Sequence, residues 1–219
     1  MPSDPDLVRA IGEDGRMSVP TKPRRPRAER TRSVDVEKAL VEAAQTVLVR
    51  DGPSAVTVRA VAAEAGVAPM GVYNHLGGKD GLVASILVRG FDGLHAAISA
   101  GDEPDPVVRL RACGQRYRTF ALENPQHYAV MFEAALPMET ESPVVAEHAT
   151  AAFMALVEKV EYGMARGAIR AGDAVDTAQQ IWSTVHGAVA LELKGLVLTP
   201  DPAATYSELL ELVIRGTAP

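Results

Sequence analysis

Apolar residues recur at helical spacing through most of the chain after residue 33. In 33–53 they fall on one face of a single helix: Val36, Leu40, Ala43, Ala44, Val47 and Leu48. The stretches 57–66 and 69–76 are much shorter, and a longer apolar pattern begins at Lys79. Spacing of three to four residues is typical of amphipathic helices. The pattern therefore predicts a first helix, two very short helices and a long fourth one.

The ends of the two short helices are marked by specific residues. Thr57 is a good N-cap, and Pro69 suits a first helical position. Gly66 and the pair Gly77-Gly78 are typical helix terminators. Two short helices joined by a glycine turn predict a helix-turn-helix. A generic pair of antiparallel helices has the same periodicity, so the pattern alone leaves DNA binding and a simple hairpin both open.

The rest of the chain predicts further helices at 104–125, 125–134, 143–169 and 173–196. A last helix is predicted from an apolar stripe at i, i+3, i+4, i+7 and i+8: Tyr206, Leu209, Leu210, Val213 and Ile214. Aromatic residues make up only 5% of the chain, which also favours helices over strands. We therefore predict an all-α protein.

Charge is distributed unevenly along the chain. The net charge of −6 argues against a nucleic-acid partner. However, residues 1–80 carry 12 Lys and Arg against 11 Asp and Glu, whereas residues 81–219 carry 10 against 17. The stretch 21–32 holds six basic residues against Glu29 alone. We predict that residues 1–33 form a disordered basic tail, which is either an arm that attracts phosphates or a solvated leader.

The sequence gives little support to a secreted protein, a membrane protein, an enzyme or a metal protein. Cys113 is the single cysteine, the acidic N-terminus does not resemble a signal peptide, and no continuous apolar stretch reaches the length of a membrane span. We expect a cytoplasmic protein without a membrane partner. The rival class is a helical enzyme or metal protein, for which Asp92 and His95 stand at i, i+3. A second such pair and a glycine-rich phosphate loop are missing, so we expect no enzyme, metal or cofactor.

The string TVRAVAAEAGVAPMGVYNHLGGKDGL, residues 57–82, resembles the DNA-binding signature of TetR/AcrR-family transcriptional regulators. The matching elements are Thr57 and Arg59, Val61-Ala62, Gly66-Val67, Val72-Tyr73-Asn74-His75-Leu76, and Lys79 with Leu82. The resemblance extends over residues 34–82. It departs from the family at Ala68, where Ser or Thr is usual, and at Gly78, where Ser or Asn is frequent. Both are helix N-cap positions, so both helices should lack a side-chain cap.

The resemblance implies that the short helix at 69–76 enters the major groove of double-stranded DNA. The residues it implies as DNA contacts are Thr57, Arg59, Met70, Gly71, Tyr73, Asn74, His75 and Lys79. Thr57, Tyr73, His75 and Lys79 would contact phosphates, while Gly71 would let the backbone approach. The other three would contact bases: Arg59 guanine, Asn74 adenine and Met70 a thymine methyl. Alternatively, Tyr73 braces the two short helices and His75 is a plain helix-end residue.

The resemblance also implies a domain organisation. The DNA-binding domain would span residues 34–94, with its helix-turn-helix at 57–76, and a regulatory and dimerisation domain would span 95–219. ENPQHYAVMF, residues 123–132, is similar to a stretch of the family's regulatory domains. The Trp182-x-x-x-His186-Gly187 pattern is similar to a subgroup of them. Family members form homodimers through their last two helices, and Gly187 would allow close approach there.

The regulatory domains of the family enclose a pocket for a small-molecule effector. Candidate lining residues are His95, Cys113, Tyr117, Phe120, Tyr128, Met131, Phe132, Phe153, Met154, Trp182 and His186. The same residue types also describe an ordinary helical core. The expected function is a repressor that a small, largely apolar ligand releases from a near-palindromic operator. The alternative is an activator, or a regulator that answers to a protein partner, and the sequence leaves the effector's identity open.

Overall fold

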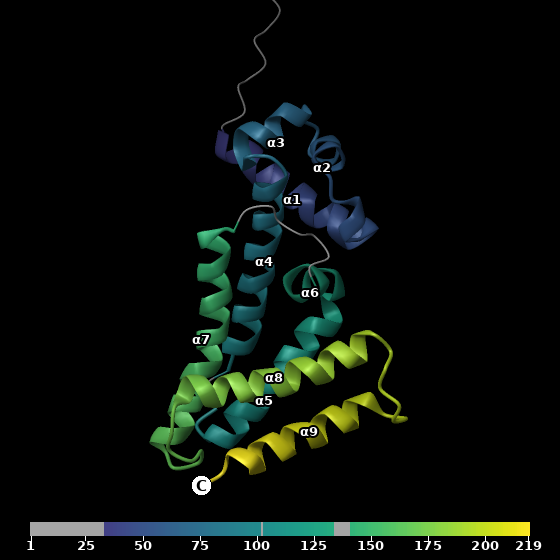
Figure 1. The fold of residues 1–219 in the computed structure, drawn as a ribbon. Coiled ribbons are helices and arrows are strands. Elements are labelled where there is room, and N and C mark those ends of the chain that lie inside the picture. Colours follow the sequence, from purple (N-terminus) through teal and green to yellow (C-terminus); the bar gives the residue numbers. More distant parts are fainter. Residues whose placement is uncertain (1–32, 102, 134–140) are drawn as a thin grey trace, which may run out of the picture. The chain divides into compact units, whose positions relative to one another are not determined.

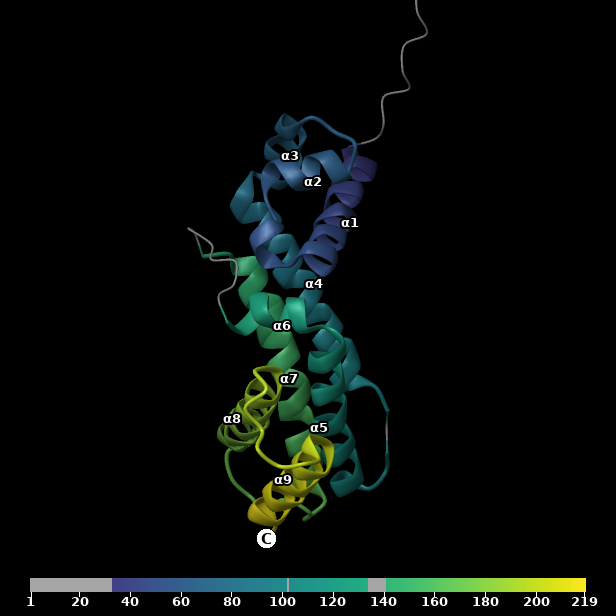
Figure 2. The ribbon, with the colours of Figure 1, turned by 90° about the vertical axis from the view of Figure 1, so that its right-hand side faces the viewer.

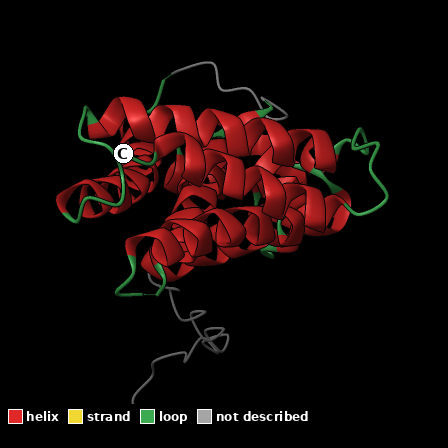
Figure 3. Ribbon diagram, turned by 90° about the horizontal axis from the view of Figure 1, so that it is seen from below, coloured by secondary structure: helices red, strands yellow, loops and turns green. Residues whose placement is uncertain are grey.

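Every regular element in the described part of the chain is a helix (Figures 1 and 3). The computed structural model describes residues 33–101, 103–133 and 141–219. Its elements are α1 (Ser33–Asp51), the 3-10 turn η2 (Pro53–Ala55), α2 (Val58–Glu64), α3 (Pro69–Leu76), α4 (Lys79–Ser99), α5 (Pro106–Glu123), α6 (Pro125–Phe132), α7 (Pro143–Ala165), α8 (Ala174–Leu193) and α9 (Pro202–Thr217). The all-α prediction is confirmed. The predicted tail lies outside the described residues except for Ser33, which begins α1.

The ends of the short helices lie at the capping and terminating residues that the sequence predicts. The Thr57 hydroxyl accepts a 3.1 Å hydrogen bond from the Ala60 backbone N–H at the start of α2. Neither α3, which follows Ala68, nor α4, which follows Gly78, has a side-chain cap. Gly77 ends α3 in the left-handed conformation, with φ 75°. The sequence departures at the two cap positions thus leave the helix boundaries where the pattern predicts them.

The buried side chains form two cores. The N-terminal core is Leu40, Ala43, Ala44, Val47, Leu48, Val56, Val61, Ala62, Val72, Leu82, Val83, Ile86 and Val130. The C-terminal core contains Ile169, the buried apolar side chains of α4 from Phe91 onward and those of α5 to α9, apart from Val130. Because α4 contributes buried side chains to both cores, it connects them as one continuous helix. The predicted boundary at residues 94 and 95 falls inside α4 and stays a prediction.

Helix α6 also joins the two cores (Figure 2). Val130 is buried in the N-terminal core, whereas Tyr128, on the same short helix, is buried in the C-terminal core. In addition, the His127 ring Nε2 contacts the side-chain oxygen of Gln45 on α1. Helix α6 therefore packs directly against α1.

In the described ranges, α4 is the one helix whose length and composition would allow it to cross a membrane. Its apolar side chains pack instead against α1, α5, α6 and α7. Burial in the two cores accounts for its apolar character.

Helices α8 and α9 lie side by side and cover α5 (Figures 1 and 2). A Cβ on Gly114 of α5 would lie 2.6 Å from a methyl group of Leu210, so α9 packs closely on α5 at this glycine. The Arg118 guanidinium of α5 donates two hydrogen bonds, 2.7 and 2.5 Å long, to the Glu192 carboxylate of α8. This ion pair is largely buried, so removing one partner would leave an uncompensated charge.

Candidate DNA-binding surface and effector cavity

Helix α3 has one buried face and one exposed face. Val72 is fully buried in the N-terminal core and anchors the helix. On the other face, the side chains of Met70 and Tyr73 are 63% and 55% exposed, and Asn74 is exposed beside them. Large apolar side chains held in solvent on a short, firmly anchored helix are typical of a contact surface.

The structure brings the eight predicted DNA contacts together on α2, α3 and the adjoining helix ends. Thr57 and Arg59 lie at the start of α2, five of the others lie on α3, and Lys79 is the first residue of α4. Six of the eight are exposed, and Gly71 and His75 are partly exposed. The exposed side chains and the N-terminus of α4, which has no side-chain cap, are groups that could contact phosphates.

The side chains of Tyr73 and His75 are exposed or partly exposed, and each also contacts another part of the protein. A Cβ on Gly78 would lie 3.1 Å from the Tyr73 ring, which places the ring against the α3–α4 turn. The His75 ring Nδ1 lies 3.2 Å from the Ser33 hydroxyl of α1. Bracing and DNA contact are thus compatible for both residues, and their contact with DNA stays a prediction.

Gly71→Ala is expected to leave the fold intact and to weaken operator binding. An added Cβ would meet only Val67 at 3.4 Å, which is ordinary contact, and alanine favours a helix over glycine by up to about 1 kcal/mol. If the α3 backbone approaches DNA at Gly71, the methyl group would separate the two surfaces. Thermal unfolding and operator titration of the variant check both parts, and unchanged operator affinity would contradict the close approach.

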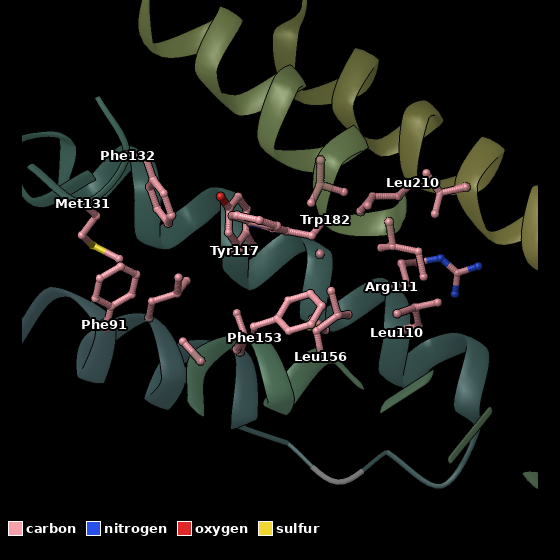
Figure 4. A pocket seen from close by; sticks show the side chains of 18 of the residues that line it. Phe91, Leu110, Arg111, Tyr117, Met131, Phe132, Phe153, Leu156, Trp182 and Leu210 are labelled. Carbon is pink, nitrogen blue, oxygen red and sulfur yellow. The ribbon is translucent and has the colours of Figure 1, made fainter. Parts of the chain in front are cut away.

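A cavity of about 230 Å³ lies inside the C-terminal core (Figure 4). Its walls come from every helix between α4 and α9. The lining residues are Phe91, Leu94, Ile98, Leu110, Arg111, Cys113, Gly114, Tyr117, Met131, Phe132, Ala149, Ala152, Phe153, Leu156, Ile181, Trp182, Val185, Leu210, Val213 and Ile214. An apolar wall with a few polar groups is typical of a site for a small organic molecule.

Six of the eleven residues predicted to line a pocket lie on this cavity: Cys113, Tyr117, Met131, Phe132, Phe153 and Trp182. Tyr128 and His186 lie behind the lining and reach it through Tyr117. Phe120 is buried beside a separate surface pocket of α4 and α6. His95 and Met154 are exposed and lie off the cavity. Asp92, considered above with His95, instead pairs with His148 at 2.5 Å.

The polar groups on the cavity wall are neutral or charge-paired. Arg111 lies at one end, where its guanidinium points away from the aromatic rings and forms two hydrogen bonds, 2.5 and 3.2 Å long, with the Glu211 carboxylate (Figure 4). Burial raises the pKa of the Cys113 thiol to about 11 and also raises the pKa of the Tyr117 hydroxyl. Both groups are therefore protonated at neutral pH.

Behind the wall, two tyrosine hydroxyls converge on one imidazole nitrogen. His186 Nδ1 lies 2.9 Å from the Tyr117 hydroxyl and 2.8 Å from the Tyr128 hydroxyl. The two hydroxyl oxygens are 3.5 Å apart. Burial lowers the pKa of His186, so this imidazole is neutral at pH 7. The cluster ties α5, α6 and α8 together at the cavity.

Acidification is expected to destabilise the fold below about pH 6.5. Burial lowers the pKa of both His127 and His186 from the ordinary value of 6.5. Their contribution to stability is fully present above that value. It is lost as the pH falls through the window below 6.5, because the unfolded chain binds protons first. Thermal unfolding between pH 7.5 and 5.0 checks this, and His186→Gln should show a shallower decline than the wild type.

The fold and the exposed α3 surface define a helix-turn-helix DNA-binding protein with a cavity in its second core. Comparisons with known proteins agree. Residues 40–86 match the family model for bacterial regulatory proteins of the tetR family. Residues 110–213 match the model for the tetracyclin repressor-like C-terminal domain. The chain belongs to the TetR family of transcriptional regulators, which is a non-enzymatic family.

Individual relatives are similar over most of the chain. An uncharacterized HTH-type transcriptional regulator of Mycobacterium tuberculosis is 26% identical over 182 residues, which are 82% of this chain and 80% of the relative. A structure of a protein with unknown function from Rhodococcus sp. RHA1 has a TM-score of 0.75 at 24% identity, covering 90% of this chain and 100% of that one. A bacterial regulatory protein in the tetR family from Rhodococcus RHA1 has a TM-score of 0.62 at 24% identity, covering 84% and 97%. At these identities, the comparison shows that this chain has the same fold as the two structures.

Proposed function

We propose that the protein is a dimeric repressor, which binds a near-palindromic operator when empty and releases it when a small apolar molecule fills the cavity. The observation that carries this proposal is the double role of α4 and α6. Both helices form walls of the cavity, and both also pack into the N-terminal core beneath the DNA-binding surface.

The path from the cavity to α3 is short on both helices. On α4, Phe91 lines the cavity, and Ile86 is buried in the N-terminal core about one and a half turns earlier. On α6, Met131 lines the cavity next to Val130, which is buried among α1 and α4 residues. A ligand that moves either wall would therefore move side chains that position α3. The ligand acts as an effector only if it prefers the arrangement that does not bind DNA.

Helices α8 and α9 support the proposed dimer. Leu191 on α8 and Leu212 on α9 are 50% and 61% exposed. Gly187 on α8 has no neighbouring atom within 4 Å of an added Cβ, so this face is open to close approach. A two-fold axis through such an interface would place two recognition helices about one duplex turn apart, which is why the operator should be a near-palindrome.

The predicted Trp-x-x-x-His-Gly subgroup also belongs to this proposal. Trp182 lines the cavity, His186 binds two tyrosine hydroxyls behind it, and Gly187 faces outward on α8. Trp182 and His186 thus lie on the cavity side of α8, and Gly187 lies on its outer side. This arrangement supports a pocket and a dimer interface on the same helix.

Selection of bound sequences from random duplex DNA tests the proposed function. The wild type should select a near-palindromic motif, because two symmetry-related α3 helices read it. Arg59→Ala should relax the motif at defined positions, since each lost bidentate contact to guanine removes about 1–3 kcal/mol of discrimination. Arg166→Ala serves as a matched control, because Arg166 is an exposed arginine that stacks on Tyr162, far along the chain from α3. Recovery of DNA without any motif would contradict the proposal.

Removal of residues 1–32 is expected to weaken binding to every DNA sequence and to flatten its dependence on salt. These residues lie outside the described part of the chain, and the prediction rests on the six basic residues in 21–32. Each lost phosphate contact reduces the slope of log affinity against log salt by about 0.9. An unchanged slope in operator titrations between 50 and 200 mM salt would exclude the tail as a DNA-binding arm.

A further inference from the structure

The described lining residues of the cavity offer no unpaired charge to an ionic ligand. Among them, Arg111 has a charged side chain, and its guanidinium is already paired with Glu211 and points away from the rings (Figure 4). The thiol of Cys113 and the hydroxyl of Tyr117 carry no charge at neutral pH. A carboxylate or ammonium group buried here would lose its hydration without gaining a partner, which is strongly unfavourable.

The volume of the cavity limits the size of the ligand. An engineered apolar cavity of about 150 Å³ in another protein holds benzene, which has six non-hydrogen atoms. The cavity here is about 230 Å³, half as large again. In proportion to benzene it would hold about nine non-hydrogen atoms. Filled to the packing density of protein interiors, it would hold up to about twelve. Rings of Phe91, Phe132, Phe153 and Trp182 around it favour a flat or ring-containing body.

The cluster behind the wall leaves a hydrogen-bond donor in excess. A neutral imidazole nitrogen accepts one hydrogen bond or donates one. Two hydroxyl hydrogens, from Tyr117 and Tyr128, compete for His186 Nδ1, and the hydroxyl oxygens are too far apart for a good bond between them. Trp182 can only donate, so it supplies no further acceptor. In either tautomer of His186, at least one tyrosine hydrogen is left with no better acceptor than the other hydroxyl oxygen, 3.5 Å away.

Position on the wall decides which hydroxyl a ligand can reach. Both hydroxyls are buried and lie at nearly the same distance from His186 Nδ1, but Tyr128 lies behind the wall. Tyr117 lines the cavity, and its hydroxyl lies on the side of Phe132 (Figure 4). A ligand with an acceptor atom near this position would offer the Tyr117 hydroxyl a closer acceptor than the Tyr128 oxygen 3.5 Å away.

We infer that the cavity takes an uncharged molecule of about nine to twelve non-hydrogen atoms, with a ring-containing apolar body and one hydrogen-bond acceptor that binds the Tyr117 hydroxyl. A ketone or ester carbonyl fits this description, and a carboxylate does not. The inference rests on the proposed function only in taking this cavity as the effector site. It specifies the class of effector, and Tyr117 as the residue that selects for the acceptor.

Three probes of similar size test the inference on the full chain: 4-phenylbutan-2-one, butylbenzene and 4-phenylbutanoate. Trp182 is the chain's single tryptophan and lines the cavity, so its fluorescence reports occupancy directly. The ketone should bind about tenfold more tightly than the hydrocarbon, because of one additional hydrogen bond. The carboxylate should bind at least about a hundredfold more weakly than the ketone, because its charge is buried without a partner.

Tyr117→Phe should lower the affinity for the ketone to that for butylbenzene and leave butylbenzene binding unchanged. Unchanged hydrocarbon binding also shows that the variant retains its cavity. Tyr162→Phe is the matched control, since the Tyr162 hydroxyl is bonded to the Pro104 carbonyl away from the cavity, and all three affinities should stay as in the wild type. Equal affinity for ketone and hydrocarbon, tightest binding of the carboxylate, or no binding of any probe up to its solubility would each overturn the inference.

Operator binding measured with the same probes separates this inference from the proposed function. If the ketone binds with the expected selectivity but leaves operator affinity unchanged, the ligand class stands and the release mechanism falls. If the carboxylate releases the operator through this cavity, the release mechanism stands and the ligand class falls.

Discussion

Gly81→Ala is expected to abolish operator binding and to destabilise the N-terminal core by about 3 kcal/mol or more. Gly81 lies in the first turn of α4, and a Cβ added there would overlap the backbone carbonyl oxygen of Leu76, the last residue of α3. Backbone cannot rotate away as a side chain does, so α3 and α4 would have to separate. Such a shift would displace Tyr73 and Lys79 relative to each other and dismantle the surface.

Two measurements distinguish this local effect from general misfolding. The C-terminal core should survive, so the fluorescence of Trp182 and its response to cavity probes should stay close to those of the wild type. Operator affinity should fall by more than about a hundredfold, because the phosphate and base contacts act together. Gly71→Ala is the control for stability, since the same methyl group added there meets only the Val67 side chain at ordinary contact distance. Wild-type stability in Gly81→Ala would show that α3 and α4 can separate at no cost.

The helix-turn-helix was predictable because its signals are local. Thr57, Pro69 and Gly77 act on the backbone next to them, and the structure has α2 and α3 where these residues indicate. The missing side-chain caps at Ala68 and Gly78 were also visible in the sequence. The close approach of Gly81 to Leu76 was not, because it depends on the angle between two helices, which no residue pattern records.

The cavity was predictable only in part, for a physical reason. The sequence predicts aromatic and methionine residues such as Phe153 and Trp182 as lining residues. Leu110 and Ile181 line the same wall, but their pattern is that of ordinary core residues. Whether an apolar side chain faces a cavity or a neighbour depends on packing between distant helices. Met154 illustrates the same limit, since it stands next to Phe153 in sequence and yet points to solvent from α7.

The paired hydroxyls at His186 could not be inferred from the pattern either. Tyr117, Tyr128 and His186 are on three helices, and only the fold brings them within hydrogen-bond distance. Sequence reasoning placed all three in the pocket as separate candidates. The structure instead gives them unequal positions, with one on the wall and two behind it. Because only Tyr117 of the three lies on the wall, the described lining of the pocket has one hydroxyl that a ligand can reach. This hydroxyl is the reason we expect the ligand to carry a hydrogen-bond acceptor.

Ala152→Phe is expected to abolish binding of the cavity probes and to lower operator affinity about tenfold or more without any ligand. Ala152 is buried on α7 and lines the cavity, so a ring added there would occupy space that a ligand needs. If filling the cavity moves α4 and α6, a permanent filler should act as a permanent effector. Probe titration by Trp182 fluorescence and operator titration of the same preparation check the two effects.

Ala151→Phe is the matched control, because Ala151 is the preceding residue of α7 and is exposed. It should leave probe binding and operator affinity unchanged. The informative contrary result is an Ala152→Phe variant that is folded, excludes the probes and still binds the operator as the wild type does. Occupancy of the cavity would then have no influence on α3, and the shared packing of α4 and α6 would hold the two cores together without coupling them. A fall in both affinities would instead show that the walls of the cavity and the DNA-binding surface move as one system.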